Sequence, residues 1–333
     1  MKIKFGKELM RDSKGYTIMV NPALECLGVI YVLSNFELNV PRTNQNYLAS
    51  IKGYFHAHRK HPLIEKFKKL LTNFEFKYDA PVEFFLNVFH DEKPTKELLK
   101  RAKINLKEYR EIVKLIQDFV NVSEFEKFID KNERYYRANM EKFYTDMFKF
   151  NPSRYLFDFL GDKSDYLNVV LMFGVCTANY GIKVGNEMYC CVRAYKESRY
   201  DDEIDFAYDH PYMATLLLHE FAHSFINPMT AEYKKEIAKL KKDKFKSIFD
   251  NNPYGEHTET AINELIIRAI ECEYIKAKFK SSYFSFKKNY IEEGFTFISD
   301  IETLYTEYRS DRNKYKTFGD FFPEVMAYFV GRR

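Results

Sequence analysis

Residues 214–228 of this chain are ATLLLHEFAHSFINP, an apolar stretch that contains the HExxH pattern from His219 to His223. On an α-helix, residues four apart lie on one face about one turn apart, so His219 and His223 can direct their imidazoles at one cation. Glu220 lies about 100° around the helix, where it misses the cation but reaches a water bound to it. Unpaired polar groups on a buried helix are costly, and a metal ion with its water would provide their partners. The stretch therefore predicts a metal-binding helix over about residues 211–225, with Glu220 as general base.

A later helix is expected to provide the third metal ligand. The chain after His223 lacks the glycine and the histidine that the metzincin pattern requires at positions 226 and 229, which excludes that class. A helix predicted over about residues 258–279 places Glu264, Arg268 and Glu271 within about 60° of one another on an otherwise apolar surface. We expect these three residues, the charged stripe, to face the metal, with Glu264 as the third ligand and Glu271 as the alternative. A salt-bridge ladder on a solvent-exposed face is the competing interpretation.

Two strings of sequence carry a resemblance to known proteins. The HExxH pattern, followed by a helix with an Asn-Glu pair at positions 263 and 264, resembles the gluzincin group of zinc metallopeptidases. The longer strings HEFAHSFINP and NELIIRA are similar to an uncharacterised bacterial family of gluzincin-like proteins that carries a domain of unknown function. This resemblance covers the chain from about residue 20 to residue 330 and implies no particular substrate. It implies the zinc ligands His219, His223 and Glu264 and the base Glu220.

The predicted function is a zinc-dependent metallopeptidase that hydrolyses peptide bonds through a zinc-bound water, with Glu220 as general base. A donor must stabilise the oxyanion that develops at the scissile carbonyl. Tyr254 is the favoured donor because it lies in the loop before the helix of Glu264, and His257 and Tyr328 are alternatives. Two other functions stay open. One is a catalytically inactive module that binds peptides or proteins on a zincin scaffold, and the other is a zinc-dependent hydrolase of non-peptide amides.

The rest of the sequence predicts an α+β fold that is predominantly helical. Residues 24–37 are apolar enough for either a helix or a strand. Two short segments rich in β-branched and aromatic residues, 166–176 and 188–195, predict strands that are antiparallel neighbours. Apolar residues at three- and four-residue steps predict helices over residues 62–72, 81–90, 95–102, 106–121 and 123–150.

Two regions are expected to make up the chain. A mostly helical N-terminal region, residues 1–155, would pack on a zincin-like catalytic region, residues 156–333. In the catalytic region we expect the small sheet to lie beside the HExxH helix. The segment Met188–Tyr195 would then offer an edge strand to a peptide substrate.

The composition limits the classes of partner. Of the 333 residues, 46% are hydrophobic and 30% are charged, as expected of a folded globular protein. Lysine and arginine number 52, and aspartate and glutamate 48; the net charge of +4 gives little support for nucleic-acid binding. The five cysteines show no CxxC spacing, no apolar stretch approaches the roughly 20 residues of a membrane-spanning helix, and no signal peptide is visible. We therefore expect a cytoplasmic protein that acts on a peptide or protein and not on a membrane; export after removal of a signal peptide is the alternative.

Overall fold

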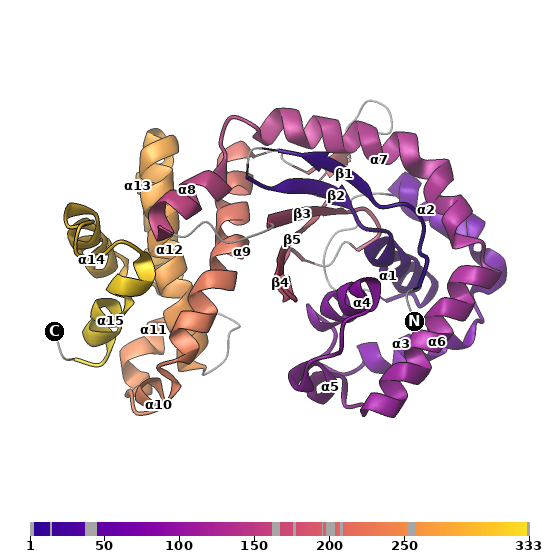
Figure 1. Ribbon diagram of the computed structural model, residues 1–333, viewed down its shortest axis with the longest axis horizontal. Helices are drawn as coiled ribbons and strands as arrows, with labels where there is room; N and C mark the ends of the chain where they lie inside the picture. The colour runs from indigo at the N-terminus through magenta and orange to yellow at the C-terminus, as the bar shows by residue number, and fades with distance from the viewer. Residues whose placement is uncertain are drawn as a thin grey trace. The chain divides into compact units, whose positions relative to one another are not determined.

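The computed structural model of the chain describes residues 3–13, 15–36, 45–161, 167–175, 178–194, 196–197, 204–206, 209–251 and 257–331. Its contacts divide the chain into two compact units, coloured along the sequence in Figure 1. Unit 1 comprises Met1–Phe148 and Tyr166–Tyr208, and unit 2 comprises Lys149–Asp165 and Asp209–Arg333. The described elements are mostly helices with one small mixed sheet, which confirms the α+β, predominantly helical class. Each unit combines two stretches of the chain, and the expected division after residue 155 stays a prediction.

None of the helices in the described part of the chain is long and apolar enough to cross a membrane.

The helices of unit 1 follow the sequence pattern closely. Asn21 accepts hydrogen bonds from the backbone N–H groups of Ala23 and Leu24, at 2.9 and 3.3 Å, and starts helix α1 (Pro22–Leu33). The residues of α1 are buried from its start to Val32, so the ambiguous apolar stretch is a fully buried helix. The five predicted helices are confirmed, with ends shifted by up to about three residues. Unit 1 contains α2 (Gln45–Tyr54), the 3₁₀ turn η1 (His56–His58), α3 (Pro62–Leu71), α4 (Ala80–His90), α5 (Lys96–Ala102), α6 (Leu106–Val122) and α7 (Phe125–Met147).

The sheet of unit 1 has five strands in the order β1-β2-β3-β5-β4. Helix α7 contacts β1 and β2, while α1 contacts β3 and α4 contacts β4 (Figure 1). A separate two-stranded ribbon follows the sheet in the chain. The strands are β1 (Leu9–Asp12), β2 (Thr17–Val20), β3 (Leu167–Met172), β4 (Tyr180–Val184), β5 (Glu187–Arg193), β6 (Lys196–Glu197) and β7 (Ile204–Asp205).

Two expectations about this sheet are wrong. Strands β3 and β5 are neighbours, but they run parallel, with Leu167 opposite Met188 and Met172 opposite Arg193. The reason is β4, which follows β3, turns at Gly185 and pairs antiparallel with β5. Because β5 lies between β3 and β4, both of its edges are paired, and the segment from residue 188 to 195 is not the edge strand that we expected. The sheet belongs to unit 1 and the HExxH helix to unit 2, so the expectation that they lie side by side stays a prediction.

A buried carboxylate ties α1 to the end of β3. Glu25 is 1% exposed; its Oε1 accepts from the backbone N–H of Phe173 at 3.0 Å, and its Oε2 accepts from the Tyr47 hydroxyl at 2.6 Å. One turn further along α1, Gly28 faces Gly174 so closely that a Cβ built on Gly28 would lie 2.6 Å from the Gly174 Cα. Only a residue without a side chain fits this crossing.

Unit 2 is built around α12 (Thr258–Lys278), which contacts α9 (His210–Ala231), α13 (Tyr283–Glu292) and α14 (Ile298–Ser310) (Figure 1). The predicted helix over residues 258–279 is confirmed. Helix α9 continues past the predicted end near residue 225. Pro228 does not stop the helix but lies within its final part. The other elements are α8 (Pro152–Leu160), α10 (Lys234–Ile237), η2 (Lys242–Phe245), α11 (Lys246–Asn251), η3 (Lys280–Ser282) and α15 (Phe318–Phe329).

Candidate metal centre

Helix α9 brings the two histidines of the HExxH pattern together. Asp209 caps this helix by accepting from the backbone N–H of Tyr212 at 3.0 Å, and the apolar residues Leu217, Leu218, Phe221 and Ala222 are buried. The side chains of His219 and His223 are 13% and 19% exposed. Their Nε2 atoms lie 3.0 Å apart, so both rings point at one place.

Helix α12 adds the Glu264 carboxylate. Its Oε1 lies 3.3 Å from His223 Nε2, and its Oε2 lies 3.7 Å from His219 Nε2. One atom from each of the three residues lies within 4.8 Å of the others. Two ligands of a tetrahedral zinc ion are about 3.3 Å apart, because each lies about 2.0–2.1 Å from the metal. The Nε2–Nε2 separation of 3.0 Å and the 3.3 Å between Glu264 Oε1 and His223 Nε2 are close to that value; the 3.7 Å to His219 Nε2 is measured from the other oxygen of Glu264, Oε2.

The hydrogen bonding of Glu264 also fits a cation. Its side chain is 5% exposed, and its Oε2 accepts no hydrogen bond from the described residues. A buried carboxylate oxygen without a donor is costly unless a cation replaces the lost hydration. His219, His223 and Glu264 therefore form a group that could hold a metal ion, and zinc is one of the ions that such a donor set accepts.

The two carboxylates of the charged stripe are buried and the Arg268 side chain is only 14% exposed, which rules out a solvent-exposed ladder. Glu271, 2% exposed, places Oε1 2.5 Å from Nδ1 of His219, on the opposite side of the ring from the metal group. Glu271 is therefore a hydrogen-bond partner of a ligand, while Glu264 stands in the ligand group. Arg268 lies between them: its guanidinium is 3.5 Å from Glu264 Oε2 and 3.9 Å from Glu271 Oε2. It also lies 3.9 Å from Glu293 Oε2.

Electrostatic coupling across the two helices favours a positive charge at this point. Burial acts to lower the pKa of His219, but the nearby carboxylates of Glu271 and Glu264 outweigh it and raise that pKa to about 9. Burial acts to raise the pKa of Glu264, yet His219, His223 and Arg268 bring it down to about 2. The same carboxylates would stabilise a metal ion bound between the three side chains.

Sequence reasoning missed some partners of the ligands. Asn227 Oδ1 lies 3.2 Å from His223 Nδ1, and its position four residues after His223 on one helix was the available signal. Glu271 was expected as a member of the charged stripe and as the alternative ligand, but not as the partner of His219 Nδ1. Nothing in the sequence indicated that the Arg268 guanidinium lies over the rings of Tyr290 and Phe295, 4.8 and 4.6 Å from their centroids.

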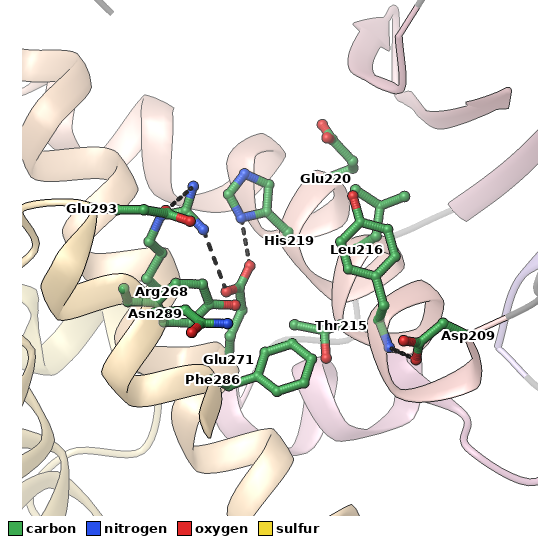
Figure 2. Close-up of a pocket in the computed structure, with 12 residues that line it drawn as sticks. Asp209, Thr215, Leu216, His219, Glu220, Arg268, Glu271, Phe286, Asn289 and Glu293 are labelled. Carbon is green, nitrogen blue, oxygen red and sulfur yellow. Dashed lines mark hydrogen bonds and ion pairs between the residues drawn. The ribbon is translucent and has the colours of Figure 1, made fainter. Parts of the chain in front are cut away.

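A cavity of about 520 Å³ borders this centre. Figure 2 shows the Glu271 carboxylate in it, between the His219 ring and the Arg268 guanidinium. Glu220 also lines the cavity, and its carboxylate makes no hydrogen bond or ion pair with the described residues. The complete lining is Asp209, Tyr212, Thr215, Leu216, His219, Glu220, Arg268, Glu271, Phe286, Asn289, Tyr290 and Glu293.

The geometry does not test the favoured oxyanion donor, and it gives no support to the two alternatives. Tyr254, the favoured residue, lies outside the described residues. His257 is the exposed residue that precedes α12, and it does not line the cavity. The hydroxyl of Tyr328 donates to Asp300 Oδ2 at 2.5 Å, and Tyr328 is absent from the cavity lining as well.

Comparison with known proteins gives one family. No curated protein and no solved structure is detectably similar to the chain. A family model described as a domain of unknown function, DUF4932, matches residues 92–328, which include α9, α12 and the whole metal group. The match confirms that the chain carries a domain of unknown function, as the resemblance implied. It does not test the resemblance to the gluzincin group of zinc metallopeptidases. Because the matched residues are well over half of the chain, the chain belongs to the DUF4932 family.

Proposed function

We propose that this protein is a zinc-dependent metallopeptidase that hydrolyses peptide bonds. The observation that carries the proposal is the convergence of His219 Nε2, His223 Nε2 and one Glu264 oxygen within 4.8 Å of one another on two buried helices. Two histidines and one glutamate, with a further position left for water or substrate, are the ligand set of catalytic zinc in several peptidases. The HExxH spacing adds a glutamate next to the first ligand, where a general base is needed.

The residues of this chain divide the work of hydrolysis between them. Zinc held here would polarise the scissile carbonyl and lower the pKa of a bound water. Glu220 would take the proton of the attacking water and pass it to the leaving amine. Glu271 and Asn227 face the Nδ1 atoms of the two histidines and would keep both Nε2 atoms directed at the metal.

The position of Glu220 favours an enzyme over a binding module. Its carboxylate lines the cavity and has no partner among the described residues, so it is available as a base. A module that only bound peptides would need no base at this position. A hydrolase of non-peptide amides would use the same groups, so substrates must separate that alternative.

Metal analysis and a peptide-library digest test the proposal together. Protein purified without added metal should contain about one zinc per chain, because the site has one set of ligands. Glu220→Gln should keep the zinc and lose at least about 100-fold in hydrolysis, because the amide cannot accept a proton. Glu232→Gln is the matched control, since Glu232 is an exposed carboxylate at the other end of α9.

Each contrary result has its own meaning. Failure to bind zinc after reconstitution contradicts the metal site itself. Zinc-loaded protein that cuts small amides but no peptide indicates the amide hydrolase. Zinc-loaded protein that binds peptides and cuts neither class indicates the inactive module.

A further inference from the structure

The cavity beside His219 has a charge that its metal centre does not balance. Among the described residues, Arg268 is the one lysine or arginine in its lining, while Asp209, Glu220, Glu271 and Glu293 are carboxylates. A divalent metal and Arg268 together carry three positive charges. Glu220, Glu271 and the ligand Glu264 carry three negative charges in return. Asp209 and Glu293 add two more carboxylates, so the described lining, the ligand Glu264 and a divalent metal together sum to a net charge of about −2.

Arg268 is committed to carboxylates that are already present. Its guanidinium lies within 3.5–3.9 Å of Glu264, Glu271 and Glu293 and is covered by the rings of Tyr290 and Phe295. It is therefore poorly placed to receive a carboxylate from a substrate. The cavity disfavours anionic groups on this ground as well as by its net charge.

A buried acceptor in the cavity wall still needs a donor. Glu271 Oε2 accepts no hydrogen bond from the described residues, although the side chain is only 2% exposed, and its contact with Arg268 is 3.9 Å long. Buried carboxylate oxygens normally accept hydrogen bonds, so a donor from water or from a ligand is expected here. A protonated amine or a guanidinium provides donors and a positive charge at once.

The apolar walls suit the same kind of group. Tyr212 and Phe286 line the cavity together with the buried ring of Tyr290. Figure 2 shows Phe286 between the Glu271 and Asp209 ends of the cavity. Aromatic faces attract cations, and they also cover the methylene stem of a long side chain. The volume of about 520 Å³ leaves room for one such side chain and its hydration.

We propose that this cavity is a substrate subsite for a cationic nitrogen group of a peptide, either a lysine or arginine side chain or a free N-terminal amine. Asp209 and Glu293 are the residues that determine the preference. The proposal rests on the proposed function in that the substrate is a peptide held next to the zinc. It adds which peptides are selected.

Binding to the zinc-loaded Glu220→Gln variant tests the subsite without depending on hydrolysis. The probes are labelled alanine-based hexapeptides with one central lysine or its uncharged analogue norleucine, each with a free or an acetylated N-terminus. If the side chain is recognised, the acetylated lysine peptide should bind about fivefold to tenfold more tightly than the acetylated norleucine peptide. If the amine is recognised, the free norleucine peptide should exceed its acetylated form by a similar factor.

Charge-removing variants then assign the effect to the cavity. Asp209→Asn should lower the preference for the cationic peptide by about threefold to fivefold, because one partly exposed ion pair is lost. Asparagine is as good a cap as aspartate, so α9 should be preserved. Adding Glu293→Gln should remove the preference, so that the cationic and uncharged peptides bind about equally, whereas Glu232→Gln, far along α9, should leave it unchanged.

Two results would overturn the subsite. One is equal binding of all four peptides. The other is a cationic preference that survives in the Asp209→Asn/Glu293→Gln variant. Failure of the proposed function looks different, because the library digest by the wild-type protein then shows no cleavage whatever the binding preference.

Discussion

Glu271 is predicted to hold His219 in place for the metal ion. Its Oε1 lies 2.5 Å from His219 Nδ1, and the side chain is 2% exposed. A carboxylate on Nδ1 fixes the tautomer that leaves Nε2 free to bind metal and makes the imidazole a stronger ligand. Loss of such a partner costs about 10–100-fold in metal affinity, or about 1.4–2.7 kcal/mol.

Two substitutions separate the charge of Glu271 from its hydrogen bond. Glu271→Gln keeps an oxygen that can accept from Nδ1 and removes only the charge, so we expect about a tenfold loss of zinc affinity. Glu271→Met also removes the acceptor and leaves Nδ1 buried without a partner, so we expect about a 100-fold loss. Glu264→Gln removes a ligand and should lose more than either.

Competition with a fluorescent zinc chelator at fixed pH measures these affinities. Glu273→Gln is the control, because Glu273 is on the same helix and is similarly buried but pairs with Arg309 at 2.9 Å. Circular dichroism should show that each variant keeps its helices. The positioning role is wrong if Glu271→Met binds zinc as tightly as the control. If Glu264→Gln binds zinc normally while Glu271→Gln does not, the two carboxylates have been assigned the wrong way round.

Two further predictions concern unit 1. Burial raises the pKa of Glu25 from 4.5 to about 7, although donors from Tyr47 and Phe173 oppose the rise. The Glu25 carboxyl loses its proton near pH 4.5 in the unfolded chain but keeps it up to about pH 7 in the folded chain. The free energy of unfolding should therefore fall by about 3 kcal/mol between pH 4.5 and pH 7 and stay low above pH 7. In urea titrations at about pH 5 and pH 8, the wild type should lose about 3 kcal/mol more stability than Glu25→Gln, because other groups such as His219 titrate alike in both proteins; parallel behaviour of the two proteins contradicts it. Gly28→Ala should cost at least about 1–3 kcal/mol in the same assay because its Cβ meets the Gly174 backbone, whereas Gly53→Ala, with open space around it, should be neutral or stabilising.

The metal group could be predicted from the sequence because its geometry is local to two helices. The spacing of His219 and His223 fixes both residues on one face of any α-helix, whatever surrounds it. Glu264 could be found because it belongs to a charged stripe on a helix whose other residues are apolar, and the structure shows that stripe buried. The sequence favoured Glu264 and kept Glu271 as the alternative, since both lie on the same face. What separates them is the position along α12 at which α9 crosses it.

The sheet shows the opposite case, in which local pattern misleads. The alternation of buried and exposed residues from Tyr180 to Val184 marks β4 as a strand, yet the sequence predicted strands only over residues 166–176 and 188–195 and none between them. Once that strand is omitted, β3 and β5 appear to be joined by a simple connection, for which an antiparallel pair is the natural prediction. In the structure β4 pairs antiparallel with one edge of β5, and β3 pairs parallel with the other edge of β5. The direction of a strand pair thus depends on how many strands lie between the two strands along the chain. Missing the five-residue strand β4 was enough to reverse the predicted direction of the β3–β5 pair and to misplace the edge of the sheet.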